Sequence, residues 1–285
     1  MAHRQEITLE GPHGKPILLD YRYEADGKTK PVVIFTHGFK GFKDWGHFDV
    51  LADAFAEAGF VFIKYNLSHN GTTPEQPNDF VDLEAFGRNT FSIELDDLGA
   101  VIDWAVETDA MPKTEKDTDQ LYLIGHSRGG GLTILKAAED TRVKKIATWA
   151  SVAEFGHFWT PEVMEKWKKE GVQYVINGRT GQEMPMYYDL YEDYAQNMQR
   201  LHIPTAARSL TIPHLIAHAK DDPAVSFAAA EELHAESQHS ELLAMEDGGH
   251  TFGGKHPWES DTLAPQIETV LEETVAFLFG NYAKH

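Results

Sequence analysis

Residues 121–131 read LYLIGHSRGGG: an apolar run, a serine between glycines, and the start of a second regular segment. The run Leu121–Gly125 predicts a buried strand, and residues 129–140 follow with a helical pattern. Between them, the GHSRG motif at residues 125–129 fits G-x-S-x-G, in which a sharp strand-to-helix turn presents a serine hydroxyl at the edge of a sheet. We therefore expect Ser127 to be a nucleophile, the alternative being a glycine-rich turn that only joins two elements.

A serine hydroxyl is a poor nucleophile at neutral pH and needs a base. His250 is the candidate because it lies in DGGHTF, just past the last expected strand, where a loop residue reaches the same edge as Ser127. Two adjacent aspartates, Asp221 and Asp222, follow an earlier strand and precede a Pro-x-Val turn. We expect Asp222 to orient His250, with Asp221 as the alternative.

Attack on a carbonyl also requires two backbone N–H groups that stabilise the negative oxygen. The amide of Arg128, directly after the serine, is one candidate. The other is the amide of Phe39 in the HGFKG segment at residues 37–41, which follows the strand Pro31–Thr36. Gly38 would let this backbone turn toward a substrate oxygen.

Most of the chain alternates short apolar runs with helical patterns, which predicts an α/β fold: a mostly parallel sheet of about eight strands with helices on both faces. The runs Glu6–Glu10 and Ile17–Tyr23 flank a turn signal and are expected to form an antiparallel edge. Further strands are expected at Pro31–Thr36, Phe60–Tyr65, Lys145–Ala150, Pro213–Ala217 and Leu242–Met245. Further helices are expected at Phe48–Ala58, Leu83–Glu107, Phe227–Ser237 and Thr262–Phe279, with loops at 66–82 and 108–120.

Residues 152–211 break the alternation. They separate two parts of one expected core domain, 1–151 and 212–285, and are predicted to form a small lid insertion. The insertion is expected to contain an aromatic-rich helical piece, a hairpin around an Asn-Gly turn and another helix. These elements are expected at Phe155–Lys169, at Val172–Ile176 with Gln182–Tyr188, and at Tyr191–Leu201.

Aromatic residues of the insertion are candidates for a substrate pocket, with Trp159 and Tyr187 singled out, and Trp258 joins them near His250. The alternative is that these rings only pack the insertion and the last helix onto the body. Arg179, in the hairpin turn, could meet a substrate carboxylate, although surface exposure is the stronger expectation.

Composition narrows the possible functions of the 285-residue chain. Its formal net charge of −20 disfavours nucleic acid and anionic membranes as partners. With no apolar run of about 18 residues and no visible signal segment, no membrane contact is expected. The chain has no cysteine, which excludes a cysteine nucleophile and favours the cytoplasm. No nucleotide motif or metal-ligand spacing is present, so no cofactor and no metal are expected, and the oligomeric state is left open.

Together, the segments HGFKG, GHSRGG, KDDPAV and GGHTF resemble the α/β-hydrolase superfamily. The likeness covers about residues 16–280, and the order serine, aspartate, histidine is the one expected of that fold. Within the superfamily the chain is similar to dienelactone-hydrolase-like and prolyl-oligopeptidase-like bacterial esterases, including cinnamoyl and feruloyl esterases. It departs from dienelactone hydrolases by having no cysteine, and from prolyl peptidases by having no β-propeller.

The resemblance implies a serine carboxylic-ester hydrolase that works through an acyl-enzyme on a small or aromatic-acyl, hydroxycinnamate-like ester. Two alternatives stay open. The same triad could cut small peptides or aminoacyl amides, and a chain with this fold could be a non-catalytic binding protein.

Overall fold

The structure is a computed structural model that describes residues 2–156 and 159–283. Its central strands are β1 (Ala2–Glu10), β2 (Pro16–Glu24), β3 (Lys30–Thr36), β4 (Val61–Tyr65), β5 (Lys116–His126), β6 (Val143–Trp149), β9 (His214–Ala219) and β10 (Ser240–Met245). They form one sheet in the order β1-β2-β4-β3-β5-β6-β9-β10. β2 is antiparallel to both β1 and β4, and all other neighbours are parallel. The expected sheet, with its antiparallel edge, is confirmed.

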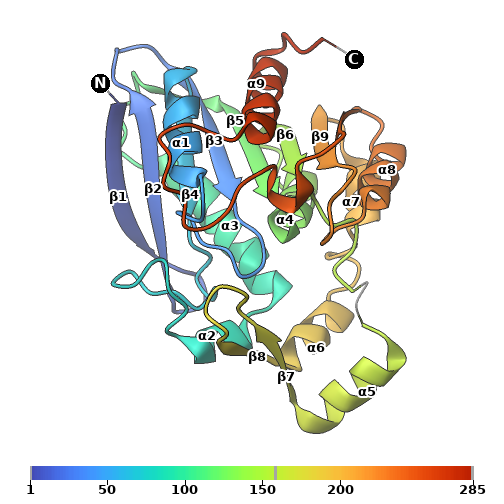
Figure 1. The fold of residues 1–285 in the computed structure, drawn as a ribbon. Coiled ribbons are helices and arrows are strands. Elements are labelled where there is room, and N and C mark those ends of the chain that lie inside the picture. Colours follow the sequence, from blue (N-terminus) through green and yellow to red (C-terminus); the bar gives the residue numbers. More distant parts are fainter. Residues whose placement is uncertain (1, 157–158, 284–285) are drawn as a thin grey trace.

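Helices cover both faces of this sheet (Figure 1). The main ones are α1 (Phe48–Glu57), α3 (Phe91–Glu107), α4 (Arg128–Glu139), α8 (Phe227–Glu236) and α9 (Pro265–Phe279). α1 and α9 pack on one face, and α3, α4 and α8 on the other. Within the described residues, no helix combines the length and the apolar character needed to cross a bilayer.

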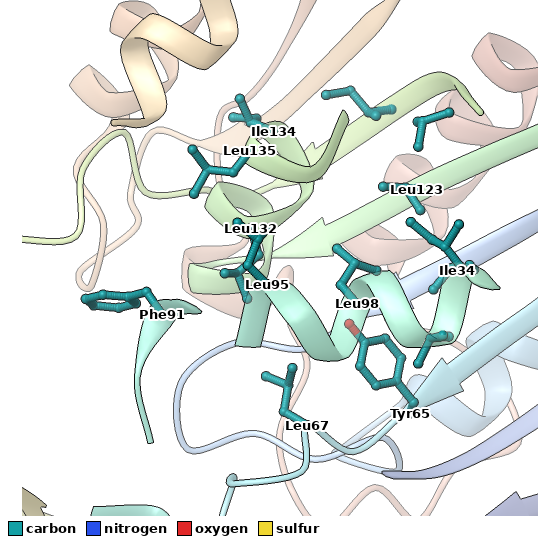
Figure 2. Packing of buried hydrophobic residues seen from close by; sticks show 14 of the residues in the cluster. Ile34, Tyr65, Leu67, Phe91, Leu95, Leu98, Leu123, Leu132, Ile134 and Leu135 are labelled. Atoms are coloured by element: carbon teal, nitrogen blue, oxygen red, sulfur yellow. The ribbon is translucent and has the colours of Figure 1, made fainter. Parts of the chain in front are cut away.

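The central strands are buried on both faces, so each contributes to two hydrophobic cores. Successive side chains of a strand point to opposite faces, so Ile34 joins the core under α3 and α4 while Phe35 joins the core under α1 and α9. Figure 2 shows the first of these cores, where Leu98 of α3 lies near Ile34 of β3, and Leu132 of α4 lies beside Leu95 of α3. This double burial explains the nearly continuous apolar runs of these strands.

The strand order creates the place where a site can form. From β3 the chain continues to β4 on one side of it, and then crosses to β5 on its other side. At such a reversal the connections leave in opposite directions, and a crevice opens beyond the carboxyl ends of the strands. The segment after β3 and the turn after β5 both begin there, which brings residues 37–41 and Ser127 to one crevice.

The helix predicted over Leu83–Glu107 is in fact two helices, α2 (Leu83–Arg88) and α3. The backbone of Asn89 and Thr90 is extended, which ends the first helix. The Thr90 side chain then caps α3 by accepting a hydrogen bond from the Ile93 N–H at 3.3 Å. A polar capping residue inside an otherwise helical pattern is the signal that the prediction missed.

The stretch predicted as a charged loop over residues 108–120 also contains the start of β5. Lys116 and Asp117 pair with the first residues of β3, and a register shift separates this pairing from the apolar part of the strand. The side chains near this end of β5 are partly exposed, which explains their polar character.

Between β6 and β9 the chain forms α5 (Pro161–Glu170), the hairpin strands β7 (Val172–Ile176) and β8 (Glu183–Tyr187), α6 (Asp189–Gln196) and α7 (Ile203–Ser209). In Figure 1 the hairpin lies beside α2, with α5 and α6 next to it. The expected aromatic helical piece begins only at Pro161, and its residues 157 and 158 lie outside the described residues. The short helix α7 was not predicted. That this segment acts as a lid stays a prediction.

Candidate active site

Ser127 occupies the turn between β5 and α4 in a backbone conformation that non-glycine residues rarely adopt. Its φ is +57° and its ψ is −122°. Three hydrogen bonds hold it there: its N–H donates to Trp149 O at 2.9 Å, and its carbonyl accepts from Gly130 N–H at 2.9 Å and from Val152 N–H at 3.4 Å. Backbone strain of this kind costs roughly 1–3 kcal/mol and persists only where the surroundings enforce it.

Three glycines allow the chain to pass this close to itself. A Cβ at Gly125 would lie 2.2 Å from Gly129 O, and a Cβ at Gly129 would lie 2.3 Å from Thr36 O. A Cβ at Gly38, on the segment after β3, would lie 2.8 Å from the Cβ of Ser127. The glycines of the G-x-S-x-G motif are therefore required by contact with neighbouring backbone, and Gly38 lies directly against the serine.

His250 lies in a short 3-10 helix, η1 (Gly249–Thr251), after β10. Its Nε2 is 3.0 Å from Ser127 Oγ, and its Nδ1 is 2.8 Å from Asp222 Oδ2. Because a carboxylate can only accept, Nδ1 carries the proton and Nε2 is the acceptor for the serine hydroxyl. This is the tautomer in which a histidine can remove a proton from serine.

The side chain of Asp222 is fully buried, yet it is well supplied with hydrogen bonds. Its Oδ1 accepts from the N–H groups of Ala224 and Val225 at 2.8 and 2.9 Å. Burial alone would raise the pKa of Asp222, but hydrogen bonds from His218, His250 and Val225 outweigh it and hold the pKa below its ordinary value. The carboxylate therefore stays ionised next to the imidazole.

Two further side chains fix the loop of His250. Asp221 Oδ1 accepts a hydrogen bond from Gly249 N–H at 2.8 Å. His126 Nε2 donates to the carbonyl of His250 at 2.8 Å, and burial lowers the pKa of His126 to about 3, so this ring is neutral. No sequence pattern indicated this role for His126, because it occupies a variable position of the G-x-S-x-G motif.

The two predicted oxyanion donors belong to segments next to the serine: Arg128 directly follows it in the chain, and Phe39 follows Gly38, which lies against it. Arg128 is the first residue of α4, so its N–H has no acceptor within the helix. Phe39 follows Gly38, whose carbonyl accepts from His37 Nδ1 at 2.8 Å, while His37 Nε2 accepts from Leu67 N–H at 3.3 Å. The buried imidazole of His37 thus holds the backbone immediately before Phe39.

The side chain of Arg128 connects the two donor segments. Its guanidinium carbon lies 4.0 Å from the centre of the Phe39 ring and 5.1 Å from that of Phe91. Its Nη1 donates to Glu94 Oε1 of α3 at 3.2 Å. These contacts fix the side chain of Phe39 relative to the start of α4.

Ser127 and His250 both line a cavity of about 390 Å³. Its other lining side chains are mostly aromatic or carry N–H hydrogen-bonding groups: Phe39, Lys40, Phe42, Trp45, Phe48, Phe80, His126, Asn177, Arg179, Thr251 and His256. Asn177 and Arg179 belong to the turn of the β7–β8 hairpin, so the insertion contributes one wall. Apolar walls with a few polar groups are typical of small-molecule sites.

The three residues predicted to bind substrate do not line this cavity, which corrects that part of the sequence analysis. Trp159 packs among other aromatic rings of the insertion. The hydroxyl of Tyr187 donates to Glu84 Oε2 at 2.6 Å, and Nε1 of Trp258 donates to Thr262 O at 3.1 Å. Their aromatic surface serves packing, which was the alternative interpretation.

Several lining residues were not singled out from the sequence. Phe42 and Trp45 lie within four residues of the end of the HGFKG segment, and this position was the one signal available for them. Phe80, Asn177 and His256 reach the cavity only through the folding of three separate loops. No local pattern indicates them.

Comparison with known proteins agrees with this architecture. A family model described as the alpha/beta hydrolase fold matches residues 31–182. Two Escherichia coli proteins, each described as "Uncharacterized 31.7 kDa protein in traX-finO intergenic region", are 29% and 28% identical to this chain over 149 residues. Each match covers 52% of this chain and 47% of the relative, so the chain spans about half the length of the curated relatives it matches.

Solved structures match over nearly the whole chain. Est1E from Butyrivibrio proteoclasticus has a TM-score of 0.68 at 17% identity, covering 97% of this chain and 98% of that one. Est1E with ferulic acid bound has a TM-score of 0.69 at 18% identity, covering 96% and 98%. The alpha/beta hydrolase GrgF from Penicillium sp. sh18 has a TM-score of 0.70 at 17% identity, covering 98% and 99%. At such identities the likeness shows the fold alone.

Proposed function

Because the chain belongs to the alpha/beta hydrolase fold family, we propose that it is a serine hydrolase of carboxylic esters with Ser127, His250 and Asp222 as its triad. One observation carries the proposal: an unbroken line of hydrogen bonds runs from Asp222 through His250 to Ser127, and Ser127 and His250 line the cavity. Serine catalysis requires a nucleophile, a base and a group that orients the base, and this line of hydrogen bonds supports those three roles.

The reaction has two steps. In the first, His250 Nε2 takes the proton of Ser127 Oγ as this oxygen bonds to the ester carbonyl carbon, and the N–H groups of Phe39 and Arg128 hold the negative carbonyl oxygen. When the carbon–oxygen bond to the alcohol breaks, His250 returns the proton to the leaving oxygen. In the second step, water gives a proton to the same imidazole and attacks the acyl carbon, and His250 then returns that proton to Ser127 Oγ as the bond to the acyl group breaks and the acid leaves.

The lining of the cavity supports a small or aromatic acyl group. Five aromatic side chains face the space beside Ser127, and flat rings pack well against such walls: Phe39, Phe42, Trp45, Phe48 and Phe80. Est1E, which shares the fold, has been solved with ferulic acid bound. Hydroxycinnamate esters are therefore the first aromatic substrates to test.

Labelling with a fluorophosphonate, which reacts covalently with an activated serine, tests the nucleophile. We expect the wild-type protein to be labelled and Ser127→Ala to be unlabelled, with kcat for a neutral ester reduced by ~10⁶-fold. Ser209→Ala, an exposed serine at the end of α7, is the matched control and should label normally. Labelling that survives in Ser127→Ala would refute the assignment, and a folded wild-type protein that is never labelled would support a binding protein.

A kinetic panel separates the ester proposal from an amide hydrolase. It compares acetate esters, hydroxycinnamate esters and aminoacyl amides by kcat/KM at one pH. Hydroxycinnamates should rank highest because only they fill an aromatic-lined cavity of this size. A clear preference for acetate would remove the aromatic-acyl proposal, and a preference for the amides would favour the peptidase alternative.

A further inference from the structure

The cavity differs in charge from the rest of the chain. Acidic residues outnumber basic ones by 45 to 25 over the whole sequence. Among the described residues that line the cavity, however, none is an aspartate or glutamate, while Lys40 and Arg179 both line it. A cationic lining within a strongly acidic protein indicates a place where negative charge is accepted.

Of the two cations, Lys40 is the one whose charge is not balanced by a neighbouring carboxylate among the described residues. Its Nζ donates to the carbonyl of Ile176 at 3.0 Å, and none of the ion pairs found in the described part of the chain includes it. An ammonium has three donors, so a single carbonyl does not use its capacity. Lys40 also has a φ of +56°, in the left-handed region where glycine would be unstrained, so this position keeps a lysine at a conformational cost.

Asn177 contributes a buried donor without a protein partner. The residue is only 7% exposed. Its Oδ1 accepts from Arg179 N–H at 3.1 Å, which fixes the orientation of the amide. Its Nδ2 is buried and has no hydrogen-bond partner. An unpaired buried donor costs roughly 1–3 kcal/mol. Asn177 lines the cavity, so a small movement of its amide toward an acceptor oxygen of a bound ligand would remove this cost.

The guanidinium of Arg179 is held at the cavity wall. Its Nη2 donates to Asp79 Oδ1 at 2.9 Å and to Asn78 O at 3.3 Å. Asp79 is 61% exposed, so this ion pair is weak and leaves the guanidinium able to attract a second anion. A planar guanidinium has five donors, which suits a carboxylate.

We propose that the substrate is an ester that also carries a carboxylate, and that Lys40, Asn177 and Arg179 bind this carboxylate while the ester carbonyl reacts at Ser127. This inference rests on the proposed ester hydrolysis and names its substrate class. All three residues line one cavity and carry hydrogen-bond donors, two of them charged, and the hairpin turn of the insertion supplies two of the three. The insertion thereby selects substrates by charge.

Matched pairs of esters test the preference, with the carboxylate either free or masked as its methyl ester. Mono-4-nitrophenyl glutarate carries the carboxylate on the acyl side, and 4-acetoxybenzoate carries it on the alcohol side. We expect kcat/KM for the free acid to exceed that for its methyl ester by ~10-fold or more in one pair, and that pair identifies the side that enters the cavity. Equal or lower values for the free acids in both pairs would overturn the proposal.

Variants connect the preference to the named side chains. Arg179→Gln and Lys40→Gln should each lower the ratio of kcat/KM between free acid and methyl ester by about 5–10-fold, because each removes a positive charge. Asn177→Asp keeps the acceptor for Arg179 N–H but replaces the donor by a carboxylate, so it should lower the ratio further. Arg208→Gln, whose guanidinium pairs with Glu236 away from the cavity, is the control and should leave the ratio unchanged.

A binding measurement separates this inference from the proposed activity. Calorimetry on Ser127→Ala should detect binding of monomethyl glutarate. The same variant should bind dimethyl glutarate at least ~10-fold more weakly. Turnover of neutral esters without any charge preference would defeat the inference and leave the proposed function standing. Carboxylate binding without turnover of any ester would defeat the proposed function alone.

Discussion

At the residue scale, Asp221 and Asp222 are neighbours in the chain but contact different parts of the loop that carries His250. Asp222 accepts from the imidazole, whereas Asp221 accepts from the backbone N–H of Gly249. The sequence indicates both aspartates as candidates, and only the Pro-x-Val turn that follows them favours Asp222. The choice depends on the direction in which each side chain leaves the turn, and this direction is visible only in the folded structure.

Asparagine substitutions test the two roles. Asp222→Asn presents an N–H to His250 Nδ1 and forces the other tautomer, so Nε2 can no longer accept the proton of Ser127, and kcat should fall by ~10⁴-fold. Asp221→Asn keeps an oxygen that accepts from Gly249 and should cost less than about 10-fold. Ester hydrolysis is the measurement, with circular dichroism to verify folding. If Asp221→Asn proved the more damaging, the acid would have to be reassigned.

At the element scale, α3 carries a buried carboxylate that the proposed chemistry does not use. Asp97 Oδ2 accepts from Ser68 N–H at 2.7 Å, while its Oδ1 has no hydrogen-bond partner. Burial raises the pKa of Asp97 to about 7, and the nearby Glu94 adds to this rise, although the hydrogen bonds from Ser68 oppose it. The folded protein therefore holds a proton here that the unfolded chain releases near pH 4.

The sign of the resulting pH dependence follows from that difference. The stability associated with Asp97 is fully present below its ordinary pKa of 3.8 and is lost as the pH rises to about 7. Asp97→Asn cannot ionise and can still accept from Ser68. Between pH 4 and 8, the free energy of unfolding of Asp97→Asn should therefore rise relative to that of the wild type by on the order of 2–4 kcal/mol, as measured by urea unfolding.

An exposed aspartate on the same helix provides the control. Asp103→Asn, which loses a surface pair with Arg142, should change stability by less than about 1 kcal/mol at either pH. A pH-independent difference between Asp97→Asn and the wild type would mean that the buried carboxylate is already ionised in the folded protein.

The elements themselves show what a local pattern can predict. Strands such as β3 were predicted to within one residue, because their apolar runs are bounded by turn residues. The break between α2 and α3 was missed because the helix propensity of the residues favours one long helix. In the structure, the Thr90 side chain accepts a hydrogen bond from Ile93 N–H, which begins a second helix there. The residues that line the cavity were harder still to predict from the sequence, since they come from loops that lie far apart in the chain.

At the scale of the whole molecule, the alternation of strands and helices was sufficient to predict a parallel sheet, but it does not specify the order of the strands. That order depends on long-range pairing, including the position of the antiparallel hairpin next to β4. One long-range feature there is a cluster of buried charges. Asp20 of β2 lies 2.8 Å from Lys64 Nζ of β4 and 3.1 Å from Lys43 Nζ in the segment after β3.

This cluster joins the edge of the sheet to the segment that carries Phe39. Asp20 also accepts from Arg22 Nε at 3.3 Å. Burial alone would raise the pKa of Asp20, but the charges of Lys64, Lys43 and Arg22 outweigh it and hold the pKa below 3.8. Asp44 and Asp49 lie near enough to Asp20 for the three carboxylates to resemble a cation site, but both lysines also contact this group and balance its charge.

Removing the central carboxylate should therefore destabilise the protein far more than removing a peripheral one. Asp20→Asn leaves buried ammonium groups undercompensated and should lower the free energy of unfolding by about 3–5 kcal/mol. Asp53→Asn is the matched control, because Asp53 pairs with Arg22 in the same cluster but is 54% exposed, and should cost about 1 kcal/mol or less.

Urea unfolding at neutral and acidic pH measures both effects. The contribution of Asp20 is present above its ordinary pKa of 3.8 and is lost as the pH falls through its lower folded value, so the penalty of Asp20→Asn should shrink in acid. Because Lys43 belongs to the segment that carries Phe39, Asp20→Asn should also reduce kcat for a neutral ester below the melting temperature. Equal costs for Asp20→Asn and Asp53→Asn would show that the cluster is dispensable and that apolar packing alone holds this edge to the site.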